Sequence, residues 1–221
     1  EVIDEDETLR LATYGELQLG PYNKSPLGAS VDLPVGKRTE SIVDVLRESN
    51  SKAGAAVLTL QLSQSFVTSV TLNVKEDEDI SARVPVEARK VIPVPLSDVA
   101  LEWVEVPPLK NTPEGEREVL IAAIQNAALN ETKEIIASLQ KKSSTPEIEV
   151  FSAMRALSGD EGEVLAIIDC GAKTNKLYLV EGGFLRRIHR VQARGSMSTK
   201  RLAEMLSLEF GEAENIKRNF A

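Results

Sequence analysis

The sequence has 221 residues, with 34 acidic and 26 basic side chains and a formal net charge of −8. Aromatic side chains are scarce, at one Trp, three Tyr and five Phe. Proteins that bind nucleic acid usually present a basic, aromatic-rich surface, so this composition argues against nucleic acid as a partner. The hydrophobic fraction of 42% is typical of a folded globular protein and excludes a disordered one.

Cys170 is the single cysteine, so an internal disulfide is impossible and the protein needs no oxidising compartment. No apolar stretch approaches the roughly 18 residues that span a bilayer, which predicts no direct membrane span. Residues 1–7 are acidic and do not resemble a signal peptide. Since the sequence opens on Glu1 and not on Met, we expect the numbering to start inside a longer, cytoplasmic gene product.

Hydrophobic periodicity predicts that the chain begins with a strand and a helix. Apolar and polar residues alternate over 9–19, which is typical of a strand. Apolar residues at helical spacing predict a helix over 39–50, with Thr39 or Ser41 as its cap and Gly54 at its end.

Four further strands and two helices are predicted before residue 143. The strands are expected over 56–62, 66–74, 99–106 and 117–124, and the last two are expected to pair antiparallel across a loop. An amphipathic helix is predicted over 126–142. The second strand alternates cleanly, and one of its faces is predicted to carry Phe66, Thr68, Val70, Leu72 and Val74.

A run of acidic residues, 76–79, follows that second strand. Such a run is compatible with a metal site, but it is also typical of a helix N-terminus, whose partial positive charge favours carboxylates. We interpret the run as the start of a helix that continues to about Lys90. Pro93 and Pro95 then end the helix, because proline disfavours the helical conformation in the residue before it.

Residues 158–162 predict a junction between two domains, because Gly and small polar residues cluster there. Before the junction, a short strand at 148–150 leads into a helix at 152–157. After it, the pattern predicts three strands, over 164–169, 176–180 and 184–191, and then two helices, over 197–206 and 211–219. The chain is therefore predicted to be a mixed α/β protein built from small alternating units.

The strongest local signal for chemistry is the hairpin turn after strand 164–169. Asp169 ends a hydrophobic strand that we expect to be buried, Gly171 lets the backbone approach an anion, and Thr174 adds a hydroxyl. Such a turn suits the terminal phosphates of a nucleotide, with Asp169 holding Mg²⁺ through water or orienting an attacking water. The alternative is an ordinary hairpin, in which Asp169 accepts turn amides and Gly171 is needed only for its dihedral angles.

The other reactive or capping side chains are interpreted as structural. His189 lies among arginines, with no second histidine, cysteine cluster or nearby acid to act with it. We therefore expect His189 to be neither a metal ligand nor a base. Cys170 has no histidine partner and is expected to be a buried thiol. Trp103 is expected in the core or at a subdomain interface. The helix at 197–206 is expected to be capped by Ser196, Ser198 and Thr199.

The order of motifs in the last third resembles the second half of the actin-like ATPases. The turn at 169–174 is followed by Gly195-x-x-x-Thr199 at a helix start and by Ala213-Glu214-x-x-Lys217 in the last helix. This order is similar to the pilus-assembly branch, the PilM family, in which an IDxGxxxT hairpin precedes a GxxxT helix start and an AExxK helix.

The first half supports the same resemblance, with two departures. Residues 87–95 are similar to the family's EA-x-x-x-IP-x-P segment, and residues 154–157 lie where its A-x-x-R-A helix would be. The phosphate hairpin that opens the family's fold is missing, because Glu1-Val2 looks like the tail of the strand after it. Ala172 stands where related hairpins commonly have glycine.

The resemblance implies an α/β fold of the actin-like (ribonuclease H-like) type with an inserted small α+β subdomain, incomplete at both termini. Residues 1–63 would form a partial first subdomain and 64–143 the inserted, 1C or SHS2-like subdomain. Residues 144–159 would return to the first subdomain, and 160–221 would start the second actin-like subdomain with its phosphate-type hairpin.

The resemblance also implies that the longer parent protein binds ATP and Mg²⁺. The residues it assigns to the cofactor are Asp169, Gly171, Ala172, Lys173 and Thr174. Asp169 would be the catalytic residue and would hold the metal through water. Because only one of three nucleotide-holding segments lies within these 221 residues, we expect no cofactor bound to them and no activity, and leave open whether the parent is a weak ATPase.

The implied function is that of a cytoplasmic scaffold, peripheral at the inner membrane, in a type IV pilus or related secretion machine. It would dock the cytoplasmic tail of a PilN-type inner-membrane protein, with the pilus motor ATPase and a second copy of itself as further contacts. The docking groove would include residues 56–62, 91–96 and 99–106. The alternatives are an ATP-hydrolysing enzyme or kinase of the same superfamily, and a cell-division (FtsA-like) or type II secretion scaffold.

Overall fold

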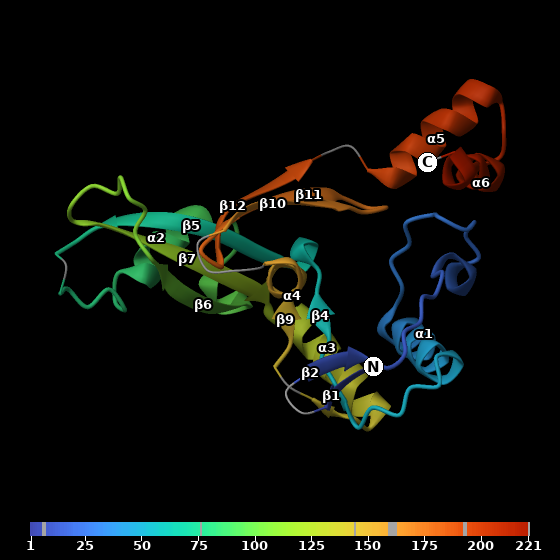
Figure 1. The fold of residues 1–221 in the computed structure, drawn as a ribbon, viewed down its shortest axis with the longest axis horizontal. Coiled ribbons are helices and arrows are strands. Elements are labelled where there is room, and N and C mark those ends of the chain that lie inside the picture. Colours follow the sequence, from blue (N-terminus) through green and yellow to red (C-terminus); the bar gives the residue numbers. More distant parts are fainter. Residues whose placement is uncertain (6–7, 76, 144, 159–162, 192–193, 221) are drawn as a thin grey trace.

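The structure is a computed structural model that describes residues 1–5, 8–75, 77–143, 145–158, 163–191 and 194–220. Helices and strands alternate along the chain (Figure 1), so the predicted mixed α/β class is confirmed.

The N-terminal region is less regular than predicted. β1 (Val2–Glu5) and β2 (Thr8–Leu11) form an antiparallel hairpin, so the strand predicted over 9–19 ends at Leu11. A single 3-10 turn, Gly20–Asn23, follows in the long connection to the first helix.

The first helix, α1 (Val35–Glu48), begins before the predicted range of 39–50 and ends well before Gly54. Thr39 and Ser41 do not cap it. Both lie inside the helix, where their hydroxyl groups donate to backbone carbonyls three or four residues earlier. Local side-chain bonds of this kind are common for Ser and Thr within helices.

The strand predicted over 56–62 is two short strands, each paired in parallel with a strand from much later in the chain. β3 (Ala55–Ala56) pairs with β8 (Lys142–Ser143), and β4 (Thr59–Leu60) pairs with β9 (Glu147–Ile148). The chain therefore leaves this region after Leu60 and returns to it at Lys142.

Between these points the chain forms an antiparallel sheet in the order β5-β7-β6. Its strands are β5 (Ser65–Asn73), β6 (Val99–Val106) and β7 (Glu116–Gln125), so the predicted pairing of the last two is confirmed. The alternation in β5 is confirmed as well: Phe66, Val70 and Leu72 pack in one cluster with the helix α2 (Val84–Val91).

The central strand, β7, is covered on both faces. Val119 and Ile121 pack in the cluster that contains α2, whereas Leu120 belongs to the cluster on the opposite face. A strand buried on both sides needs an uninterrupted apolar run, and residues 119–124 supply one.

Residues 77–79 of the acidic run do not start a helix, which corrects the prediction, and Glu76 lies outside the described residues. α2 begins at Val84, with Pro85 in its first turn. Proline is tolerated in the first turn of a helix but not in its interior, so a helix that ran through the acidic residues is excluded. Asp79 accepts the Ser81 amide and Glu78 pairs with Arg83, both in the loop before α2.

α3 (Asn126–Leu139) follows β7 directly and packs against α1, close to its predicted range. α4 (Glu149–Leu157) begins earlier than the predicted 152–157. The predicted domain junction at 158–162 falls mostly on residues 159–162, which lie outside the described part of the chain.

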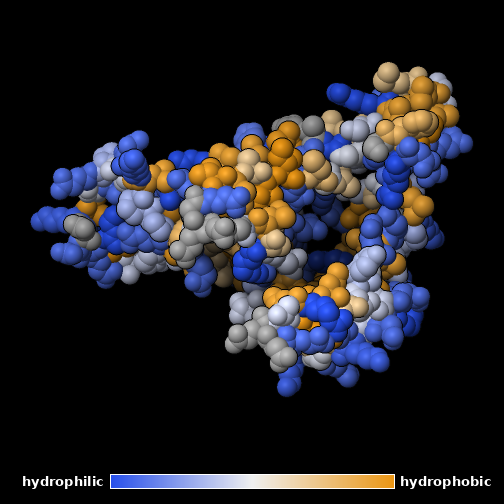
Figure 2. Space-filling view, in the orientation of Figure 1, coloured by the Kyte–Doolittle hydropathy of each residue, from blue (hydrophilic) through white to orange (hydrophobic). Residues whose placement is uncertain are grey.

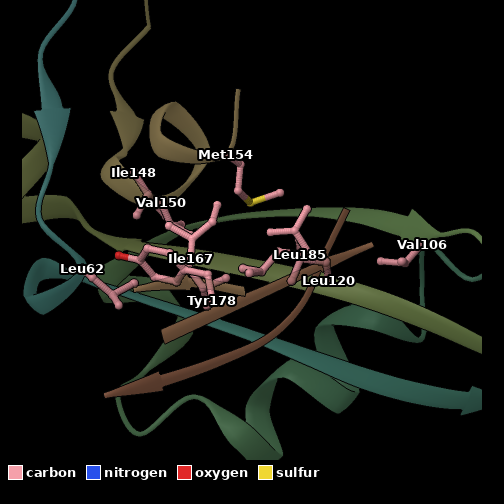
Figure 3. Close-up of a cluster of buried hydrophobic side chains, with 11 residues drawn as sticks. Leu62, Val106, Leu120, Ile148, Val150, Met154, Ile167, Tyr178 and Leu185 are labelled. Atoms are coloured by element: carbon pink, nitrogen blue, oxygen red, sulfur yellow. The ribbon is translucent and has the colours of Figure 1, made fainter. Parts of the chain in front are cut away.

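A second antiparallel sheet follows, in the order β10-β11-β12 (Val164–Cys170, Asn175–Glu181 and Phe184–Val191). One face of it packs on α4 and on the β5–β7 sheet. In Figure 3, Tyr178 and Ile167 lie near Leu62 and Val150, and Leu185 lies beside Leu120. Each large apolar side chain buried here contributes about 1.5–3 kcal/mol.

β10 is buried on one face only, which corrects the expectation of a buried strand. Ile167 faces the core, but Val164 and Ile168 are exposed. Cys170 shares their face and is exposed, so the predicted buried thiol is wrong. The cause is the two-residue alternation of a strand whose second face is uncovered.

The described chain ends in a pair of packed helices, α5 (Gly195–Leu206) and α6 (Phe210–Phe220). Figure 2 shows hydrophobic residues at the surface over these helices and over the β10–β12 sheet, whereas the loops at the far end of the β5–β7–β6 sheet are mainly hydrophilic.

Candidate functional site

The turn between β10 and β11 is closed by the pairing of Cys170 with Asn175. A Cβ atom on Gly171 would lie 2.6 Å from the carbonyl oxygen of Thr174, so no other residue fits there without a backbone shift. Gly171 does not have a positive φ. Close backbone approach, and not a special dihedral angle, is therefore why this turn needs glycine.

The same turn caps α5. The amides of Gly195 and Ser196 donate to the carbonyl oxygens of Gly171 and Ala172 at 3.1 and 3.2 Å. No side chain caps the helix, so the prediction that Ser196, Ser198 and Thr199 do so is wrong. Turn carbonyls replace the side-chain oxygens that usually accept these amides.

The predicted phosphate-binding residues form one continuous surface. Within the described residues, the amides of Ala172, Lys173 and Thr174 have no hydrogen-bond acceptor. The Lys173 ammonium lies 2.6 Å from Asp32, in the loop before α1, and both side chains are exposed. Amides and an ammonium group on one turn are the groups that bind an anion.

Asp169 is bound to a lysine that the sequence analysis missed. Lys176 Nζ donates to Asp169 Oδ2 at 2.8 Å and to Glu149 Oε1 at 2.7 Å. Glu149 Oε1 also accepts the Leu62 amide at 2.8 Å, and the Tyr178 hydroxyl lies 3.4 Å from Asp169. Asp169 and Lys176 are direct cross-strand partners, so the spacing of a symmetric hairpin was the signal for this pair.

The charge of this lysine is stabilised despite its burial. Burial alone lowers the pKa of Lys176, but the hydrogen bonds to Asp169 and Glu149 outweigh it and raise the pKa above 10.5. Burial raises the pKa of Tyr178 to about 12. Lys176 is therefore charged and Tyr178 neutral at physiological pH.

A second buried network joins α5 to α6 through the two motifs noted in the sequence. Thr199 Oγ1 lies 2.6 Å from Glu214 Oε2, and Lys217 Nζ lies 2.6 Å from the same oxygen. Arg218 donates to the other carboxylate oxygen at 2.8 Å. Burial alone raises the pKa of Glu214, but the hydrogen bonds from Lys217, Thr199 and Arg218 lower it to about 2.

The loop before α1 packs directly on this network. Gly28 has φ +78°, and a Cβ atom on it would lie 2.3 Å from the Glu214 side chain. The contact places residues from the start of the chain beside the last helix. Sequence periodicity gave no sign of it, because residues 22–34 have none.

Two cavities meet at the β10–β11 turn, and both have Gln61, Gly171 and Lys173 in their walls. The larger, about 550 Å³, extends to α5 and α6. The smaller, about 310 Å³, lies over Asp169, Glu149 and Lys176. The larger cavity is lined by more basic than acidic groups, namely Lys173, Arg194, Lys217 and Arg218 against Glu16, Asp32 and Glu214.

Outside these cavities, β6 is an edge strand, with no strand paired to its outer side in the described part of the chain. It is the outer strand of the β5-β7-β6 order, and its residues 102–105 are all exposed. Trp103 is 36% exposed and Val104 46%, so Trp103 lies outside the core, which was one of the two places expected for it. His189 is exposed on β12. Among the described residues, no three His, Cys, Asp or Glu side chains are grouped as metal ligands.

Comparison with solved structures finds a similar mixed α/β fold in other proteins. The chain matches a chain of the PilM–PilN type IV pilus biogenesis complex with a TM-score of 0.69 and 21% sequence identity, over 96% of this chain and 62% of that chain. Residues 33–221 match the family described as type IV pilus assembly protein PilM. The chain therefore belongs to the PilM family, as the resemblance predicts.

Two further structural matches are weaker. One is the cytoplasmic domain of EpsL, an inner membrane component of the type II secretion system of Vibrio cholerae (TM-score 0.48, 12% identity, 85% of this chain and 66% of that one). The other is the ethanolamine utilization protein EutJ from Carboxydothermus hydrogenoformans (TM-score 0.36, 25% identity, 41% and 32%). Comparison with curated protein sequences gives no match. None of the helices in the described ranges is long and apolar enough to cross a membrane.

Proposed function

We propose that this protein is a scaffold of the type IV pilus assembly machine that binds the cytoplasmic tail of a PilN-type inner-membrane protein, at the cytoplasmic face of that membrane. The single observation that carries the docking proposal is the open edge of β6. Its residues 102–105 are exposed, while Leu120 and Ile121, their neighbours on β7, are buried. The family assignment favours the pilus machine over the cell-division and type II secretion alternatives.

The proposed contact is the addition of a strand. An edge strand offers backbone amides and carbonyls to an extended peptide, and side chains on alternate positions supply specificity. Trp103 and Val104 supply apolar area, and Glu102 adds a negative charge that favours a basic or amphipathic tail. Val91 and Val94, also exposed, lie in the segment that leads into β6 and belong to the docking region predicted at 91–96.

The test is a calorimetric titration of the protein with a peptide from the cytoplasmic tail of the neighbouring membrane protein. Trp103→Ala is expected to weaken binding by about tenfold or more, because it removes an aromatic anchor. Met205→Ala on α5, which removes an exposed apolar side chain away from β6, is the control and is expected to leave binding unchanged. No binding of the peptide to the unaltered protein contradicts the proposal.

A second candidate function, nucleotide binding by the longer parent protein, is favoured by the turn itself. Amides without acceptors at 172–174 and the basic groups of the larger cavity are suited to ATP phosphates. If Asp169 orients an attacking water, Asp169→Ala abolishes ATP turnover by the parent. An unchanged turnover rate contradicts the catalytic role of Asp169.

The division of the chain into subdomains belongs to the same proposal. The parallel pairing of β3 with β8 and of β4 with β9 supports residues 64–143 as an insertion into a unit made of 1–63 and 144–159. Residues 160–221 would start the second unit. Limited proteolysis that cuts first near residues 64 and 143 supports this division, and first cuts within β5 or β7 contradict it.

A further inference from the structure

The hairpin that we propose binds phosphate already contains a fixed cation. Lys176 reaches Asp169 and Glu149 at 2.8 and 2.7 Å, and its side chain is only 9% exposed. Its position is set by the register of β10 and β11 and by Tyr178, two residues further along the inward face of β11. Lys176 is therefore held in a fixed position in the site and is not a mobile surface side chain.

This ammonium lies where a divalent cation shared by two carboxylates would lie. Mg²⁺ is held in proteins by one or two carboxylates together with water and phosphate oxygens. A metal ion on Asp169 would either displace Lys176, leaving a buried charge without its partner, or lie beside it against like-charge repulsion. The fit of Asp169 to a metal ion is therefore poor, in contrast to the role that the resemblance implies.

We propose that Lys176 takes the place of a metal ion at this hairpin, and that a phosphate group bound in the adjoining cavity needs no metal held by the protein. The smaller cavity brings Lys176, Lys173 and Thr174 to the same space, next to the free amides of the turn. The inference rests on the proposed nucleotide site, but its metal part is tested without any nucleotide.

The first experiment titrates Mn²⁺ into the protein and follows free Mn²⁺ by electron paramagnetic resonance. We expect no difference between the unaltered protein and Asp169→Asn, because neither holds the metal at this position. Lys176→Met is expected to bind Mn²⁺ at least about tenfold more tightly, because it frees two carboxylates. Lys173→Met, which removes an exposed lysine of the same turn, is the control and is expected to gain no site.

Two results of this titration overturn the inference. The first is Mn²⁺ binding by the unaltered protein that Asp169→Asn abolishes. The second is a folded Lys176→Met protein that gains no Mn²⁺ site. If Lys176→Met does not fold, the inference is decided by comparing Mn²⁺ binding to the unaltered protein with Mn²⁺ binding to Asp169→Asn.

The second experiment measures binding of a fluorescent ATP analogue to the parent protein in Mg²⁺ and in EDTA. We expect the two affinities to differ by less than about threefold, and a loss of more than about tenfold in EDTA contradicts the inference. Absence of binding in both buffers contradicts the proposed nucleotide site, while the Mn²⁺ result still decides the role of Lys176.

Discussion

Glu214 on α6 accepts a hydrogen bond from the hydroxyl of Thr199 on α5 at 2.6 Å, and both side chains are almost completely buried. The hydroxyl carries one proton, and its shortest contact is with the carboxylate. Lys217 and Arg218 complete the coordination of that carboxylate. The pair therefore fixes the C-terminal helices to each other and presents two basic groups to the larger cavity.

Replacing Glu214 with Gln is expected to lower the free energy of unfolding by about 1–3 kcal/mol, because it leaves two cations without their counter-charge. The control is Glu204→Gln, which changes an exposed carboxylate on α5 and is expected to cost less than about 0.5 kcal/mol. Urea unfolding of the three proteins measures both values. Equal stability of Glu214→Gln and the unaltered protein contradicts the structural role of this network.

The stability due to Glu214 has a defined pH dependence. Its pKa is lowered from 4.5 to about 2, so the folded state favours the charged form. This contribution is complete above pH 4.5 and is lost as the pH falls towards 2. The difference in stability between the unaltered protein and Glu214→Gln should therefore shrink over that range, and a difference that grows on acidification contradicts the assigned charge state.

Gly28→Ala is expected to destabilise the contact between the loop before α1 and α6 by about 2 kcal/mol, because a positive φ and a clash coincide. A Cβ atom there would meet the Glu214 side chain. Gly36→Ala is the matched control: it lies in α1 with open space around it and is expected to stabilise the helix by up to about 1 kcal/mol. Thermal unfolding of both variants is the measurement, and a smaller loss for Gly28→Ala than for Gly36→Ala contradicts the packing described.

Gly171→Ala is expected to distort the β10–β11 turn, because its Cβ atom would lie 2.6 Å from a backbone carbonyl, which cannot move aside alone. We expect a loss of about 1–3 kcal/mol and faster hydrogen exchange at Gly195 and Ser196, which donate to this turn. Gly211→Ala in α6 has open space and serves as the control. Unchanged exchange at the start of α5 contradicts its capping by the turn.

Glu118 joins the two sheets, since it accepts from Arg186 at 3.1 Å and from Arg187 at 2.9 Å. Partial burial alone raises the pKa of Glu118, but the hydrogen bonds from Arg187 and Arg186 lower it below 4.5. Glu118→Gln is expected to cost about 1–3 kcal/mol at pH 7 and less as the pH falls below 4.5. Glu5→Gln breaks the exposed pair with Arg10, which solvent screens, and is expected to leave the free energy of unfolding close to that of the unaltered protein in the same assay.

Sequence patterns predicted the strands of both large sheets well, because apolar alternation in β5 and the apolar run in β7 report directly on burial. They failed where a local signal was ambiguous. The acidic residues before α2 are also typical of a loop, and Pro85 was the signal that places the helix start after them. The short strands β3 and β4 are held by partners over 80 residues away, which no local pattern reports.

The candidate site was predicted in part. The turn residues 169–174 are continuous in sequence, so their proximity follows from the hairpin alone. The contacts of Lys176 with Glu149 and of Gly28 with Glu214 depend on tertiary packing and were missed. Cys170 was misplaced because the apolar run of β10 resembles that of a strand covered on both faces, whereas only one face is covered.

The most direct test of the proposed scaffold role is hydrogen exchange of the full protein with and without the tail peptide of its membrane partner. Addition of a strand to β6 predicts slower exchange within residues 99–106, while the amides of α5 and α6 are unchanged. Tight peptide binding that leaves residues 99–106 unprotected, or that protects α5 and α6 instead, contradicts docking at this edge.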